Sequence, residues 1–248
     1  STLAPLIAAA LIIPLGWRMT FRLITIPALI SACILLLFVK ERGERADEGA
    51  EVPSLRGFLV ALRNRNVLAI SAVRTAMAFR MGVRAFIPLY FIDVLGLGTG
   101  LSSILYSLMI FGSVLGPFFW GYLSDRMRRK PLVIGVLASS SLLFLCLPRV
   151  RGVPLLAPLL FLIGFMVQTV VAQNILADSA DPAQLDQIFG FYFTLGFTLG
   201  SLSSVVFGYV VELFGFGMGF TFIAAVTAIS IAPASLIREA ARPMQPVE

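Results

Sequence analysis

The sequence contains no histidine, only two cysteines and few charged residues of either sign. Without imidazole groups, histidine-based acid–base catalysis, histidine metal sites and histidine proton relays are excluded within these 248 residues. Cys33 and Cys146 lie singly inside apolar runs, which favours two small buried hydrophobic residues over a disulfide or a metal-binding pair. Neither residue type therefore predicts a catalytic or metal centre.

Hydrophobic residues make up 58% of the chain, charged residues 13%, and the mean hydropathy is +0.95. A soluble domain of this length does not need so much apolar sequence, so the composition indicates burial in a lipid bilayer. The net charge of +6 does not indicate a nucleic-acid partner, because the basic residues cluster in short loops between apolar runs. The chain opens inside an apolar segment without an initiator methionine, which predicts that it is part of a longer protein.

Eight apolar segments follow one another, and about 20 apolar residues are enough for a helix to cross the bilayer core. They comprise residues 1–17, 23–39, 67–94, 101–124, 131–148, 153–177, 187–213 and 217–237. Residues 40–66 interrupt them with a mixed-charge run and then a predicted amphipathic helix over residues 54–62. The pattern predicts an all-α, multi-pass membrane protein with a solvated linker.

Two of these segments carry glycines four residues apart, Gly112 with Gly116 and Gly196 with Gly200. This spacing places both small residues on one helical face and predicts close packing against a neighbouring helix.

The densest cluster of charge follows the uncharged segment 101–124 and consists of Asp125, Arg126, Arg128, Arg129 and Lys130. Basic residues at the end of a membrane span mark its cytoplasmic side. Pro131 suits the first turn of a following helix, where its missing N–H costs nothing. The cluster predicts a tight cytoplasmic turn between two spans.

Residues 121–130 resemble the signature of the major facilitator superfamily, Gly-x-x-x-Asp-Arg-x-Gly-Arg-Arg or Lys. That signature lies between the family's second and third helices, with a weaker copy between the eighth and ninth. The matching residues are Gly121, Asp125, Arg126, Arg129 and Lys130, whereas Arg128 replaces the second glycine. The alternative is a basic loop that only sets topology, as in many unrelated membrane proteins.

The resemblance implies the major facilitator fold, with this chain covering helices five to twelve. Residues 1–39 would be the last two helices of the N-terminal bundle, residues 40–66 a cytoplasmic linker, and residues 67–248 the complete C-terminal six-helix bundle and its tail. In that topology the linker, the Arg126–Lys130 turn and the C-terminus are cytoplasmic. The 19 basic residues then divide into twelve cytoplasmic, four outer and three intramembrane, as expected for a multi-pass protein of the cell membrane.

Arg80 and Arg84 lie four residues apart inside one predicted span and therefore share a helical face. A charge at the bilayer centre costs at least about 2.5–3.5 kcal/mol, so such residues face a cavity or a partner. Together with Gln168, they lie on spans that match the cavity-lining seventh and tenth helices of the family, which predicts substrate-binding residues. The alternative is an internal salt bridge or contact with backbone carbonyls. Arg74 is nearer the cytoplasmic end and is expected to extend to the membrane surface.

The resemblance implies a secondary transporter that moves a small molecule by alternating access, and export of drug-like or metabolite compounds is the leading interpretation. The alternatives are an importer or exchanger of an organic anion and a transport-dead fragment. A membrane-embedded enzyme is disfavoured, because there is no histidine and the carboxylates are scattered. The turn residues Gly121, Asp125, Arg126 and Arg129 are predicted to form a conformational gate.

The predicted partners are the lipid bilayer and a small-molecule substrate, with no cofactor, no metal and no nucleic acid. No carboxylate lies at mid-depth in the eight segments. Either a coupling proton or counter-ion acts through residues outside this chain, or the parent transporter is not proton-driven.

Overall fold

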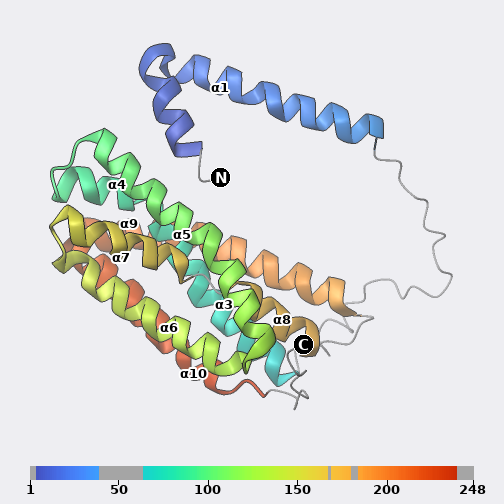
Figure 1. Cartoon of the computed structure of the whole chain (residues 1–248). Helices are drawn as coiled ribbons and strands as arrows, with labels where there is room; N and C mark the ends of the chain where they lie inside the picture. The colour runs from blue at the N-terminus through green and yellow to red at the C-terminus, as the bar shows by residue number, and fades with distance from the viewer. Residues whose placement is uncertain (1–3, 39–63, 167–168, 180–183, 239–248) are drawn as a thin grey trace. The chain divides into compact units, whose positions relative to one another are not determined.

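The computed structural model describes residues 4–38, 64–166, 169–179 and 184–238, and within them every regular element is a helix (Figure 1). The elements are α1 (Ala4–Phe38), α3 (Arg65–Val83), α4 (Ile87–Leu89), the π-helix η1 (Tyr90–Val94), α5 (Thr99–Arg126), α6 (Arg129–Cys146), the 3₁₀-helix η2 (Leu147–Arg149), α7 (Val153–Phe165), α8 (Thr169–Ser179), α9 (Leu185–Ile229) and α10 (Ile231–Ser235). The predicted all-α architecture is confirmed.

Two glycines interrupt the longest helices. Gly16 in α1 and Gly215 in α9 have φ values of 70° and 79°, in the left-handed region that glycine adopts without strain. Leu185–Ser235 holds 51 residues, which as one straight helix would measure about 75 Å, more than twice a bilayer core of about 30 Å. The break at Gly215 therefore separates two crossings.

Five described helices are long and apolar enough to cross a membrane, or six when α3 and α4–η1, bent by 42°, count as one span. Because Leu185–Ser235 divides at Gly215, these six make seven crossings, and the piece of α1 before Gly16 corresponds to the predicted segment 1–17. Of the predicted linker, residues 40–63 lie outside the described residues, and so does its amphipathic helix. Residues 64–66 belong to the start of α3.

Contacts divide the chain into the units Ser1–Ser54 and Leu55–Glu248. The boundaries predicted for the bundles and the linker, which place six helices in one bundle and two in another, stay a prediction. Within the unit Leu55–Glu248, two buried clusters form the core. One is centred on Ile70, Val133 and Leu176, and the other on Leu156 and Phe220.

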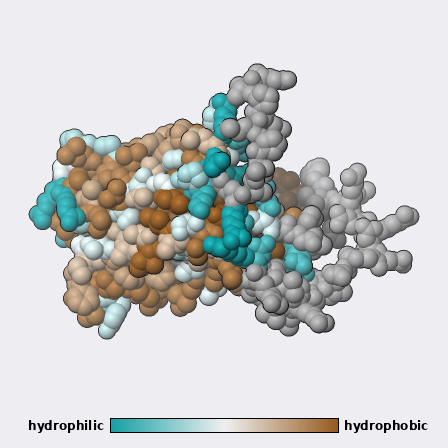
Figure 2. All heavy atoms as spheres, turned by 90° about the horizontal axis from the view of Figure 1, so that it is seen from below, coloured by the Kyte–Doolittle hydropathy of each residue, from teal (hydrophilic) through white to brown (hydrophobic). Residues whose placement is uncertain are grey.

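Large apolar side chains also cover the outside of this unit, for example Phe118, Val205 and Ile229, which are 75%, 71% and 71% exposed. On the face shown in Figure 2, hydrophobic residues occupy the middle, and hydrophilic residues gather at one end and beside the grey atoms. This distribution suits a lipid environment. The expectation that Cys33 and Cys146 are buried is wrong, because both side chains are exposed. Apolar residues of membrane helices can face lipid instead of a protein core.

Glycines bring α5 and α7 into backbone contact, which confirms the close packing predicted from Gly112 and Gly116. A Cβ atom built on Gly112 would overlap the carbonyl oxygen of Phe161, and one built on Gly116 would overlap that of Phe165. From the opposite side, a Cβ atom on Gly164 would overlap the carbonyl oxygen of Met109. The two helices therefore interlock through residues without side chains.

Candidate functional site

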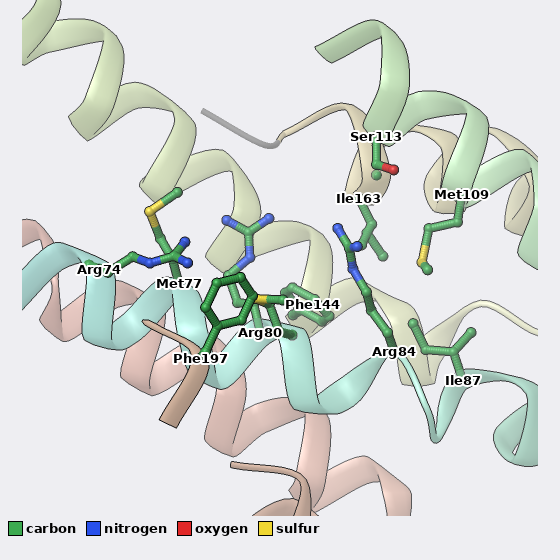
Figure 3. A pocket seen from close by; sticks show the side chains of 12 residues that line it. Arg74, Met77, Arg80, Arg84, Ile87, Met109, Ser113, Phe144, Ile163 and Phe197 are labelled. Carbon is green, nitrogen blue, oxygen red and sulfur yellow. The ribbon is translucent and has the colours of Figure 1, made fainter. Parts of the chain in front are cut away.

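Two arginines of α3, Arg74 and Arg80, and its C-cap residue Arg84 line one cavity of about 310 Å³ within the unit Leu55–Glu248 (Figure 3). The full lining is Arg74, Met77, Arg80, Met81, Arg84, Ile87, Met109, Ser113, Phe144, Ile163, Gly164 and Phe197. In Figure 3 the guanidinium groups of Arg80 and Arg84 project to the same side of α3, towards Ser113 and Met109 on α5. The described lining contains no carboxylate, so the site is cationic at one wall and otherwise mostly apolar.

Arg80 lines the cavity and also binds the backbone at the break between α7 and α8. Its Nη2 donates to the carbonyl oxygen of Met166 at 2.9 Å, and its guanidinium carbon lies 5.9 Å from the centre of the Phe144 ring. Met166 has the non-helical angles φ −74° and ψ 44°. The contact with a backbone carbonyl, which was the structural alternative for Arg80, is therefore present.

Other side chains also donate to the carbonyls freed by this break. The indole Nε1 of Trp120 donates to the carbonyl oxygen of Phe165 at 2.8 Å, and Ser140 Oγ lies 3.4 Å from that of Met166. In a bilayer there is no water to satisfy such carbonyls, so a broken helix depends on these donors. Neither Trp120 nor Ser140 was singled out in the sequence, because a donor can only be assigned once the break is located.

Arg74 does not extend to the membrane surface, so that expectation is wrong. Its side chain is only 6% exposed, lines the cavity, and lies with its guanidinium carbon 5.0 Å from the centre of the Tyr192 ring. Gly196 makes this position possible, because a Cβ atom there would overlap the guanidinium group. The sequence feature that could have indicated this buried position is Gly196, but it lies on a separate helix, α9.

Arg84 caps the C-terminus of α3 and is half-buried at the bend that leads to α4. Its backbone N–H donates to the Met81 carbonyl, but its guanidinium forms no hydrogen bond or ion pair with another residue in the described part of the chain. Gln168, the third predicted substrate-binding residue, lies outside the described residues. The three methionines Met77, Met81 and Met109 were not predicted as site residues, and they supply adaptable apolar lining.

The predicted tight turn lies between α5, which ends at Arg126, and α6, which begins at Arg129. Met127 and Arg128 are both extended, with φ values of −123° and −62°. The turn therefore needs no left-handed residue, and arginine fits at the position where the signature has its second glycine.

Among the predicted gate residues, Gly121 has room for a side chain, because a Cβ atom there would meet Val170 Cγ1 at an ordinary 3.6 Å. Asp125 and Arg126 are exposed, and the Arg126 guanidinium carbon lies 4.1 Å from the centre of the Tyr122 ring. Neither side chain is held inside the bundle in this conformation.

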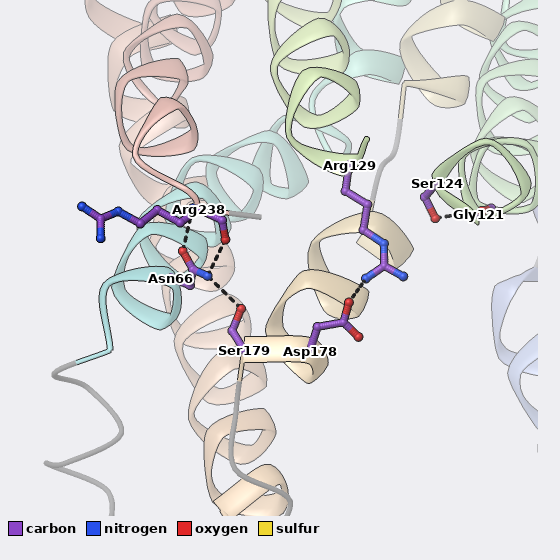
Figure 4. Close-up of polar contacts among 7 residues, drawn as sticks. All are labelled: Asn66, Gly121, Ser124, Arg129, Asp178, Ser179 and Arg238. Atoms are coloured by element: carbon purple, nitrogen blue, oxygen red, sulfur yellow. Dashed lines mark hydrogen bonds and ion pairs between the residues drawn. The ribbon is translucent and has the colours of Figure 1, made fainter. Parts of the chain in front are cut away.

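Arg129 is the buried member of the predicted gate, at 9% exposure. Its Nη1 lies 2.5 Å from Asp178 Oδ2, so an ion pair joins the start of α6 to the end of α8 (Figure 4). Asp178 was not predicted as its partner, because 49 residues separate the two and no local pattern connects them.

At the same end of the unit, hydrogen bonds join Asn66, in the predicted cytoplasmic linker, to Ser179 and Arg238. Asn66 Nδ2 donates to Ser179 Oγ at 3.0 Å and to the Arg238 carbonyl at 2.8 Å, and the Arg238 N–H donates back to Asn66 Oδ1 (Figure 4). The start of α3, the end of α8 and the segment that follows α10 therefore meet at one end of the unit, as the predicted topology requires.

Comparison with known proteins identifies a family and a related fold. The family model of the Major Facilitator Superfamily matches residues 1–116 and 100–247. Six solved chains match the fold, among them a crystal structure of tetrameric PepTSo2, with a TM-score of 0.55 and 17% sequence identity. The match covers 69% of this chain and 39% of the PepTSo2 chain. At this identity the likeness concerns the fold alone. No curated protein matches the sequence.

Proposed function

Because the chain belongs to the major facilitator superfamily, we propose that it is part of a secondary transporter that moves a small amphipathic organic anion by alternating access. Family and fold indicate a multi-pass membrane protein with a small-molecule substrate rather than an enzyme. The chain spans about two fifths of PepTSo2, at 39%. The proposal therefore concerns a longer parent transporter that contains this chain, located in the cell membrane with the Arg126–Lys130 turn, the linker and the C-terminus in the cytoplasm.

The proposal of an anionic substrate rests on the cavity, which has three arginines and no carboxylate among its described lining residues. Uncompensated cations are costly in the membrane, and a guanidinium offers a planar fork of donors that matches a carboxylate or phosphate. The apolar lining supports the rival proposal of a drug-like substrate. An anion with an apolar body satisfies both parts of the wall, so it is favoured over a neutral or cationic drug.

A matched pair of ligands tests this proposal. We expect the parent transporter to bind hexanoate at least about tenfold more tightly than neutral hexanamide, since one charge-assisted contact contributes about 1.5–3 kcal/mol. Thermal-shift titration of the purified protein measures both affinities. Counterflow in vesicles loaded on either side then measures transport and its direction, for which export is the proposed answer. Equal affinity for hexanamide and hexanoate would contradict the anion.

The turn at residues 121–130 supports a second part of the proposal, a conformational gate at the cytoplasmic end formed with Gly121, Asp125, Arg126 and Arg129. The pair Arg129–Asp178 and the contacts of Asn66 tie together helix ends that belong to separate spans. All of these contacts lie within the unit Leu55–Glu248, so they would hold its cytoplasmic helix ends together as one rigid body while the two bundles rock against each other. These residues lie away from the cavity lining, so they would control switching rather than affinity.

Removing Asp178 is expected to weaken this gate. Asp178→Ala leaves the buried Arg129 without its ion pair, and we expect a loss of about 1–2 kcal/mol in unfolding free energy, between the values for exposed and buried pairs. Turnover in counterflow should change while the affinity for hexanoate stays within about twofold of wild type. Glu212→Ala, at an exposed acid of α9, is the control. A loss of affinity with unchanged turnover would count against the gate.

A further inference from the structure

We infer that Arg74 is a second anion-binding position in the cavity, at the opposite end from Arg84, and that the ligand carries two acidic groups joined by a short apolar chain. This inference rests on the proposed transport of an organic anion and names the class of that anion. Figure 3 shows the arrangement, with Arg74 at one end of the row of side chains, Arg84 near the other, and Met77 and Arg80 between them.

The position of Arg74 is built by two helices. Its guanidinium stacks on Tyr192 of α9 at 5.0 Å, and Gly196, one turn further along α9, leaves the space that the guanidinium fills. A Cβ atom at Gly196 would lie 2.5 Å from the guanidinium carbon, closer than any real contact. The side chain is therefore held at the cavity wall, and not free to extend along α3 to the membrane surface.

Arg74 is buried without a compensating charge. Its Nε lacks a hydrogen-bond partner, and the single ion pair among the described residues is Arg129–Asp178, elsewhere in the unit. A buried charge without a partner is strongly unfavourable, and in a membrane protein it marks a ligand pathway by default. An acidic group entering the cavity would supply the missing partner.

The spacing along α3 separates Arg74 from Arg84 by ten residues, or about 15 Å along the helix axis. Arg80 lies between them but already donates to the Met166 carbonyl. Of the three arginines that line the cavity, Arg74 and Arg84 are therefore the two whose guanidinium groups have no backbone or carboxylate acceptor among the described residues. Met77 and Met81 line the space between, which suits an apolar spacer. The long arginine side chains allow a ligand shorter than 15 Å to reach both.

Adipate and hexanoate test the inference, because they share a six-carbon chain and differ by one carboxylate. In the wild-type parent transporter we expect adipate to bind at least about tenfold more tightly than hexanoate in thermal-shift titrations. Both Arg74→Gln and Gly196→Ala should bring that ratio close to one. Gly196→Ala keeps the charge of Arg74 but displaces its guanidinium, so it tests whether the position of that charge matters. Gly200→Ala is the matched control, because its new Cβ atom would find only ordinary contacts at 3.8 and 3.9 Å.

Each outcome decides the inference. A collapse of the adipate-to-hexanoate ratio in Arg74→Gln and Gly196→Ala, with the ratio retained in Gly200→Ala, supports it. A ratio that is unchanged in Gly196→Ala and Arg74→Gln overturns it, and so does a wild-type ratio near one. If Arg74→Gln does not fold, as its ligand-free melting curve would show, Gly196→Ala and Arg74→Lys decide instead, because both keep the charge. Failure of the proposed function is separate, because hexanoate would then bind no better than hexanamide.

Discussion

Gly164→Val is expected to prevent stable folding of the helix pair α5–α7, whereas Gly135→Val, in α6, should leave folding intact. A Cβ atom at Gly164 would overlap the carbonyl oxygen of Met109 and lie 3.1 Å from the backbone nitrogen of Ser113. Backbone atoms cannot rotate away as a flexible side chain does, so the two helices would have to separate. A Cβ atom at Gly135 meets nothing within 4 Å.

The expected loss of stability is large because the new side chain would clash with backbone atoms. Overpacking of an ordinary core costs about 1–3 kcal/mol, and a clash between two helix backbones should exceed that range. The glycines Gly112 and Gly116 face α7 in the same way, so α5 cannot slide to relieve the clash. Detergent-extracted variants are compared by size-exclusion chromatography and thermal melting. A Gly164→Val protein that elutes and melts like Gly135→Val would contradict this account.

The membrane helices could be predicted from hydropathy, whereas the positions of their breaks could not all be predicted. The apolar segment 101–124 gives nearly the whole of α5, Thr99–Arg126, because hydropathy alone determines a span. The breaks at Gly16 and Gly215 coincide with glycine in left-handed backbone. The break at Met166 carries no such residue. It depends on donors from Arg80 and Trp120, which lie on other helices.

The candidate site, too, was predictable only in part. Arg80 and Arg84 stand out because charge is rare in a membrane span, and both line the cavity. The position of Arg74 depends on Tyr192 and Gly196, more than 100 residues away along the chain, so sequence spacing suggested a surface position instead. The ion pair of Arg129 with Asp178 is likewise a long-range contact. Local patterns identify which residues are unusual, and tertiary packing determines what they contact.

Replacing Arg80 and Arg84 in turn by methionine should affect protein stability differently. Methionine is an unbranched side chain without charge or hydrogen-bond donors. Arg80→Met removes the donor at 2.9 Å from the Met166 carbonyl and leaves that oxygen with the 3.4 Å contact of Ser140. An unsatisfied buried acceptor costs about 1–3 kcal/mol, so the variant should melt earlier than wild type. Arg84→Met removes a cation that has no hydrogen bond or ion pair among the described residues, so its stability should stay equal or rise.

Although the two variants should differ in stability, both should lose affinity for an anion, because both arginines line the cavity. Each methionine variant is expected to lose at least about tenfold in affinity for hexanoate, since a charge-assisted contact of about 1.5–3 kcal/mol disappears, while affinity for hexanamide changes little. Thermal melting without ligand and titration with both ligands measure the two effects on the same samples. Equal destabilisation by both substitutions would show that Arg84 also holds the fold together. Unchanged hexanoate affinity in both would assign the arginines to structure alone, and a neutral drug-like substrate would then fit the apolar lining better.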